Sequence, residues 1–62
     1  MIKKAIIKKD DRFGFFSVDF YKGKQLVGTI EYLDKNIYYV EDAVENWETG
    51  ILKEETVLQY SK

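Results

Sequence analysis

Residues 40–50 carry the clearest pattern in this chain: Val40-Glu41-Asp42-Ala43-Val44-Glu45-Asn46-Trp47-Glu48-Thr49-Gly50. At 100° per residue, five apolar side chains fall within one third of a helix circumference: Val40, Ala43, Val44, Trp47 and Ile51. The carboxylates fall on a separate arc: Glu41, Asp42, Glu45 and Glu48. Gly50 stands where a left-handed C-terminal cap is expected. The pattern predicts a short helix with one face in the core and one acidic face.

Four other segments alternate as β-strands do, with apolar side chains on one side. They are Lys3–Lys9, Phe13–Tyr21, Gln25–Leu33 and Thr56–Tyr60. The side chains expected to share a face are Ala5 with Ile7, Phe16 with Val18 and Phe20, and Leu26 with Ile30 and Tyr32. Lys22-Gly23 fits a two-residue hairpin turn, and Gly28 indicates a bulge or a close approach by a packed side chain.

The order of these elements predicts an α+β fold, strand-strand-strand-helix-strand, with one amphipathic acidic helix on one face of a small antiparallel sheet. The chain has 62 residues with no linker and no repeat, so we expect one small domain over residues 1–62. Residues 37–40 fit two descriptions. Their β-branched and aromatic side chains favour a short strand, whereas Asn36 could cap a helix that begins there.

The chain contains neither His nor Cys, which removes the usual general base, thiol nucleophile and soft-metal ligands. Asp10, Asp11 and Asp19 could hold Mg²⁺ in principle, but turn formation explains the first two and strand alternation explains the third. The four glycines make no phosphate-binding pattern. We therefore expect no enzyme activity, no catalytic residue, no bound metal and no cofactor.

The apolar run near the N-terminus, Ala5 to Ile7, is too short for an export signal or a membrane span. With no cysteine and no such signal, the sequence predicts a cytoplasmic protein without membrane contact.

Charge is unevenly placed along the chain. Residues 1–31 hold seven Lys/Arg and four Asp/Glu, whereas residues 32–62 hold three Lys/Arg and seven Asp/Glu. Glu41 and Asp42 would complement the positive end of the predicted helix dipole. Glu45 and Glu48 have no basic residue four positions further on, so the helix itself does not explain them. Many charged helix faces are only solvated, which is one explanation of this acidic face. The alternative is that the face docks on a basic groove of a protein partner.

The acidic face predicts a non-enzymatic regulator or inhibitor that docks on the basic surface of a protein partner, which would suit a phage or mobile-element protein. The expected partner-binding residues are Glu41, Asp42, Glu45, Glu48, Glu54 and Glu55. One alternative is a structural homodimer or larger homo-oligomer, since a sheet covered on one face leaves an open face and open edges.

A further alternative is binding of single-stranded nucleic acid. The segment Arg12-Phe13-Gly14-Phe15-Phe16-Ser17-Val18 resembles the aromatic strand motif of RNA-recognition and cold-shock domains. In those families strand aromatics stack on unpaired bases and basic residues hold phosphates, which implies roles for Lys8, Arg12, Phe13 and Phe15. The glycine usual between the basic residue and the first aromatic is missing, and the acidic C-terminal half would repel phosphate. Nucleic acid is therefore the lesser alternative.

A longer stretch resembles HicB-type antitoxins. It comprises Ala5-Ile6-Ile7-Lys8-Lys9-Asp10-Asp11, the aromatic strand, and Val40-Glu41-Asp42-Ala43-Val44-Glu45-Asn46, which follow that family's strand-strand-helix rhythm. HicB-type antitoxins neutralise a partner toxin by direct contact. The proline-containing turn typical after the second strand is absent, as is a separate DNA-binding segment. The resemblance implies the α+β topology and carries over no functional residue.

Overall fold

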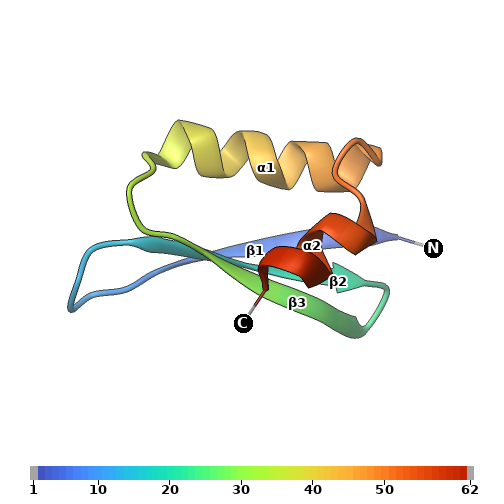
Figure 1. Cartoon of the computed structure of the whole chain (residues 1–62), viewed down its shortest axis with the longest axis horizontal. Helices are drawn as coiled ribbons and strands as arrows, with labels where there is room; N and C mark the ends of the chain where they lie inside the picture. Colours follow the sequence, from blue (N-terminus) through green and yellow to red (C-terminus); the bar gives the residue numbers. More distant parts are fainter. Residues whose placement is uncertain (1, 62) are drawn as a thin grey trace.

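The computed structural model describes residues 2–61, which form a three-stranded antiparallel sheet with two helices on one face (Figure 1). The elements in chain order are β1 (Lys3–Lys9), β2 (Phe16–Lys22), β3 (Gln25–Tyr32), α1 (Ile37–Thr49) and α2 (Glu54–Tyr60). The sheet order is β1-β2-β3. Helix α1 packs over β1 and β2, and α2 packs over β3. The predicted α+β class, with an acidic helix on one face of a small antiparallel sheet, is confirmed.

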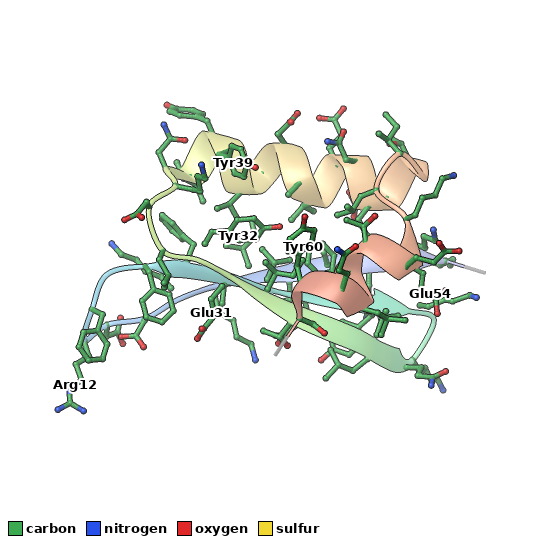
Figure 2. All side chains as sticks on the ribbon, in the orientation of Figure 1. Arg12, Glu31, Tyr32, Tyr39, Glu54 and Tyr60 are labelled. Atoms are coloured by element: carbon green, nitrogen blue, oxygen red, sulfur yellow. The ribbon has the colours of Figure 1, made fainter. Side chains whose placement is uncertain are left out.

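Strand β2 is the centre of the sheet and begins later than predicted, at Phe16 instead of Phe13. The cause is Asp10, whose Oδ1 accepts hydrogen bonds from the backbone N–H groups of Arg12 and Phe13, each at 2.8 Å. Gly14 adopts a positive φ of 76°, and its N–H donates to the Asp10 carbonyl. Residues 10–15 are therefore held as a loop, and Arg12 projects from its far end (Figure 2).

A bulge lies in the pairing between β2 and β3. Phe20 pairs with Gly28 and Tyr21 pairs with Leu26, so Val27 has no partner in the ladder. Because alternation has a period of two, the extra residue moves Leu26 away from the core face that holds Ile30 and Tyr32. Leu26 is 51% exposed. The bulge predicted from Gly28 is confirmed, but the prediction that Leu26 shares a face with Ile30 and Tyr32 is wrong.

The hairpin between β2 and β3 turns one residue later than expected. Lys22 still pairs with Gln25, so the two turn residues are Gly23 and Lys24. Gly23 supplies the required positive φ, at 63°. Its N–H donates to the carbonyl of Ile2 at 2.7 Å, which ties the turn to the start of the chain.

Helix α1 has the caps that the sequence indicates at both ends. The Asn36 side chain accepts from the Tyr39 N–H at 3.0 Å, so Ile37 begins the helix and residues 37–40 are helical, not a strand. Gly50 takes a left-handed φ of 88°, and its N–H donates to the Trp47 carbonyl. Since the helix ends there, Ile51 leaves the apolar stripe and is 72% exposed. Its predicted core position is wrong.

The last element is helix α2, where a closing strand was predicted. Val57 on α2 is fully buried, while Leu58 beside it is exposed. Glu54 and Glu55 occupy the first helical turn, where they complement the helix dipole. Gly28 makes room for the helix end, because a Cβ at Gly28 would stand 3.2 Å from Val57 Cγ1. The close approach predicted at Gly28 is therefore confirmed, although a helix makes it.

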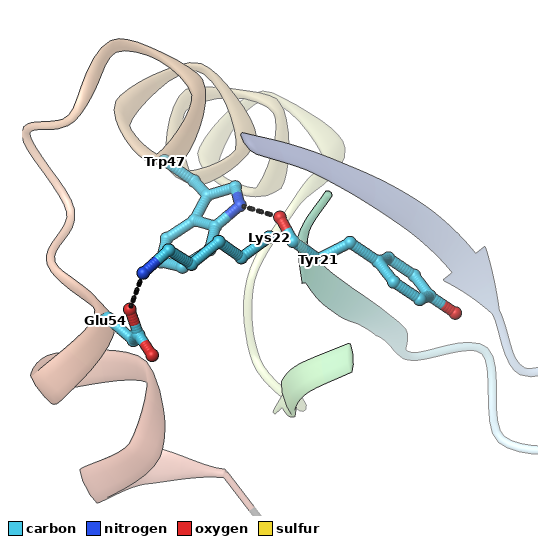
Figure 3. A network of polar contacts seen from close by, with 4 residues as sticks. All are labelled: Tyr21, Lys22, Trp47 and Glu54. Atoms are coloured by element: carbon cyan, nitrogen blue, oxygen red, sulfur yellow. Dashed lines mark hydrogen bonds and ion pairs between the residues drawn. The ribbon is translucent and has the colours of Figure 1, made fainter. Parts of the chain in front are cut away.

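The core joins both helices to the sheet. Its fully buried members are Val18, Phe20, Val40, Trp47 and Val57. The Trp47 ring meets Phe20 edge-on, with ring centroids 5.3 Å apart. The indole N–H donates to two backbone carbonyls, those of Lys4 at 3.0 Å and Tyr21 at 3.1 Å, and Figure 3 shows the second bond. Trp47 is therefore both the largest core side chain and a polar link from α1 to β1 and β2.

Candidate functional site

Three of the predicted partner-binding residues form one exposed row on α1. Glu41, Glu45 and Glu48 are spaced i, i+4 and i+7, which aligns them along the helix. All three are exposed. Within residues 2–61 none of the three forms an ion pair. We call Glu41, Glu45 and Glu48 the acidic stripe.

Helix electrostatics do not account for the acidic stripe. Because α1 begins at Ile37, its first turn contains no acidic residue, and the predicted dipole role of Glu41 and Asp42 is wrong. Glu48 lies in the last turn, at the negative end of the dipole, and no basic residue stands there to offset it. Glu41 and Glu45 are also one turn apart and repel each other. The stripe therefore costs the helix some stability.

The remaining predicted carboxylates lie elsewhere. Glu54 pairs with Lys22, with 3.3 Å between Oε2 and Nζ, and so links α2 to the end of β2 (Figure 3). Glu55 is exposed in the first turn of α2. The fold thus supplies a structural reason for both. Asp42 is separated from the stripe as well, because it lines a groove on another side of α1.

That groove lies where α1, α2 and β3 meet and has a volume of about 580 Å³. We call it the tyrosine groove, after the rings that line it, those of Tyr32, Tyr39 and Tyr60. The first two rings meet edge-on, with centroids 5.8 Å apart and an interplanar angle of 61°. Burial raises the pKa of the Tyr32 hydroxyl, and the neighbouring Tyr39 adds to the rise. Sequence reasoning missed this groove, because it requires residues 54–60 to be helical.

Lys8, a predicted nucleic-acid contact, is engaged in an ion pair on the uncovered face of the sheet. Its Nζ lies 2.7 Å from Oδ2 of Asp19, whose other carboxylate oxygen accepts from the Thr29 hydroxyl at 2.8 Å. The hydrogen bond from Lys8 holds the pKa of the nearly buried Asp19 carboxyl below its ordinary value. The same bond raises the pKa of Lys8.

The other predicted nucleic-acid contacts gather in the loop between β1 and β2. The Arg12 guanidinium lies 5.5 Å from the centroid of the Phe13 ring. Phe13 is 72% exposed and stacks on Phe15, with centroids 6.4 Å apart and an interplanar angle of 19°. We call Arg12, Phe13 and Phe15 the hairpin tip. The aromatics thus stand in a loop, and their predicted placement in a strand is wrong.

Within residues 2–61 no three His, Cys, Asp or Glu side chains come together as a metal site requires. Asp10 and Asp19, considered above as Mg²⁺ ligands, are instead bound to the loop backbone and to Lys8. Neither described helix has the length and apolar character needed to cross a bilayer.

Comparison with known proteins adds no relative. No protein-family model matches the chain, and no match was found among curated proteins or solved structures.

Proposed function

We propose that this protein is a non-enzymatic protein-binding regulator whose acidic stripe docks on a basic surface of its partner. The observation that carries the proposal is that Glu41, Glu45 and Glu48 stand in one exposed row and form no ion pair with any cation among residues 2–61. The row is electrostatically unfavourable within α1, since Glu48 opposes the helix dipole. A basic partner would relieve that repulsion on binding.

The chemistry available to the site also favours binding over catalysis. The chain offers neither histidine nor cysteine for proton transfer or nucleophilic attack. Charge complementarity, by contrast, steers association and fixes the register of a complex. Occupation of a basic groove that otherwise holds nucleic acid is one way in which such a protein would inhibit an enzyme. This last step is an analogy between surfaces.

The test begins with capture of the partner from the native host and its identification by mass spectrometry. Binding of the purified partner is then titrated against the wild type and the double variant Glu45→Lys/Glu48→Lys. We expect the reversal to weaken binding strongly, and wild-type affinity to fall as salt rises, because the attraction is Coulombic.

A matched control changes the same net charge away from the stripe. Asp11→Lys/Asp34→Lys places two lysines at exposed loop positions. Its affinity for the partner should stay within about twofold of wild type, since surface charges farther apart than a Debye length of about 8–10 Å are largely screened. Unchanged affinity in the stripe reversal, or an equal loss in the control, would sink the proposal.

The hairpin tip favours a second candidate, binding of single-stranded nucleic acid. An exposed Phe13 ring stacked on Phe15, with a guanidinium over it, offers the aromatic and cationic contacts that unpaired bases and phosphates use. Titration with a mixed-sequence oligonucleotide separates the two functions. Here Phe13→Ala should weaken binding, and the stripe reversal should strengthen it by removing negative charge.

A further inference from the structure

The tyrosine groove is built by three elements that are distant in sequence. Tyr32 comes from the end of β3, Tyr39 from the first turns of α1 and Tyr60 from the end of α2. Figure 2 shows Tyr39 on α1, Tyr32 below it and Tyr60 next to α2. The volume of the tyrosine groove is about 580 Å³, which falls within the range of roughly 300–1,000 Å³ that is typical of pockets for small ligands. The groove is therefore large enough for a side chain with its flanking backbone.

Polar side chains without partners also line this groove. Asp42 and Asn46 stand one turn apart on α1, and Thr56 faces them from α2. None of these three side chains forms a hydrogen bond or ion pair with another described residue. A carboxylate, an amide and a hydroxyl all carry acceptor oxygens. The groove therefore presents a set of acceptors to whatever enters it.

The aromatic rings add a preference for positive charge. The faces of tyrosine rings carry negative electrostatic potential, and cations bind within about 6 Å of the centroid. Tyr39 shows this preference within the molecule, since the ammonium of Lys35 lies 4.8 Å from its ring centroid. A second cation in the groove therefore has to use the ring of Tyr32 or Tyr60, or the other face of Tyr39. The edge-on arrangement of Tyr32 and Tyr39 sets two differently oriented ring planes in the groove that Asp42 also lines.

We propose that the tyrosine groove binds the guanidinium of an arginine side chain presented by the protein partner. Arginine combines a planar cation that stacks on tyrosine with five N–H donors in a fixed fork. Those donors match the acceptors of Asp42, Asn46 and Thr56. The side chains of Asp42, Asn46 and Thr56 together carry four acceptor oxygens. A lysine ammonium has three donors on a compact group and a quaternary ammonium has none, so each would leave at least one of these oxygens unused. Buried arginine and tyrosine contacts are also frequent hot spots of protein interfaces.

This inference names an anchor within the basic partner and so rests on the proposed function, but a small probe tests it alone. The experiment titrates blocked arginine, N-acetyl-arginine N-methylamide, into the whole isotope-labelled chain and follows it by NMR. We expect the largest shift changes at the ring signals of Tyr32, Tyr39 and Tyr60 and at the side-chain amide of Asn46. Blocked citrulline has a similar shape without charge and should bind at least about tenfold more weakly, because charge-assisted hydrogen bonds are about twice as strong as neutral ones.

Two variants of α1 make the matched comparison. Asp42→Asn removes a carboxylate that lines the groove, whereas Glu45→Gln removes the same charge from the exposed stripe. We expect the first to weaken blocked arginine binding about tenfold, as loss of an ionic partner does, and the second to change it less than about twofold. Both residues are exposed, so both variants should fold.

The outcomes separate the inference from the proposed function. Three results would each overturn the guanidinium assignment. They are equal losses of blocked arginine affinity in the two variants, shift changes centred on the acidic stripe, and binding of tetramethylammonium as tight as that of blocked arginine. If blocked arginine does not bind in the groove while the stripe reversal still abolishes partner binding, only the groove inference is wrong. If blocked arginine binds while the stripe reversal leaves partner affinity unchanged, the groove stands and the acidic-stripe proposal falls.

Discussion

Gly28 and Ser61 lie so close together that no side chain fits between them. A β-carbon added to Gly28 would stand 2.7 Å from Cβ and 2.9 Å from Oγ of Ser61. Separations below about 3 Å are repulsive for these atoms, since carbon contacts are optimal near 3.5–4.0 Å. The missing side chain on β3 is therefore what allows the end of α2 to pack against the sheet.

Gly28→Ala should accordingly destabilise the protein. We expect overpacking to lower the free energy of unfolding by about 1–3 kcal/mol, partly offset by the reduced freedom of the unfolded chain. The loss should be concentrated at α2, where amide shifts would change most. Urea unfolding followed by circular dichroism measures the first effect and NMR the second.

A double variant tests whether the contact with Ser61 is the cause. Gly28→Ala/Ser61→Gly removes the Cβ that the new methyl group would meet, so it should recover more than half of the lost stability. Such coupling between two sites is the signature of a direct contact. Independent, additive losses would show that the strain arises elsewhere on β3.

Trp47 should be the most sensitive core position. Trp47→Ala is expected to cost about 3–5 kcal/mol, close to the whole stability of a small domain at about 5 kcal/mol. Trp47→Phe keeps a ring but leaves the carbonyls of Lys4 and Tyr21 without the indole donor. We expect this loss to lower the free energy of unfolding by about 1–3 kcal/mol. Urea unfolding by circular dichroism should rank wild type above Phe above Ala. A Trp47→Ala variant that melts cooperatively near the wild-type temperature would contradict this.

Replacing Glu by Lys should have opposite effects on the free energy of unfolding at the C-terminal end of α1 and at the N-terminal end of α2. Glu48→Lys replaces an anion by a cation in the last turn of α1 and should raise the free energy of unfolding by about 0.3–1 kcal/mol. Glu55→Lys makes the same replacement in the first turn of α2 and should lower it by a similar amount. Both effects should shrink in high salt. Changes of the same sign would show that helix dipoles do not govern these positions.

The Lys8–Asp19 pair should make stability depend on acidity. The folded-state pKa of Asp19 is lowered, so its contribution is present above the ordinary aspartate value of about 3.9 and is lost as pH falls through the folded value. Urea unfolding measured from pH 7 down to pH 2 should show this loss in the wild type. Lys8→Gln should reduce it, and Asp19→Asn should reduce it further, since the asparagine cannot titrate. If the free energy of unfolding depends on pH equally in all three proteins, the Lys8–Asp19 pair is not the cause of that dependence.

The sequence patterns that succeeded are those with local signals. Alternation in residues 3–9, the cap residues Asn36 and Gly50, and the helical spacing of Val40 and Trp47 act within a few positions of one another. The acidic stripe follows from that helix alone. These features could be predicted because neighbouring residues determine them.

The failures depend on tertiary contacts. Thr56–Tyr60 is too short for periodicity to distinguish strand from helix, and burial of Val57 against the core decides for the helix. The charges of Glu54 and Glu55 were the available signal, because they mark a helix start. The face of Leu26 depended on the extra residue at Val27, which no local pattern marks. The tyrosine groove was missed with α2, since Tyr60 reaches it only from a helix.

The shortness of α2 has a consequence for how the molecule opens. Seven residues are too few to stay helical in water by themselves, where about 12–15 are needed for marginal stability. Helix formation and docking at α2 are therefore a single cooperative event, held by Val57 in the core and by the Lys22–Glu54 pair. Native-state hydrogen exchange should find α2 opening at a lower free energy than β2. Two walls of the tyrosine groove are thus fixed to the sheet and α1, and the third exists only while this last unit is closed.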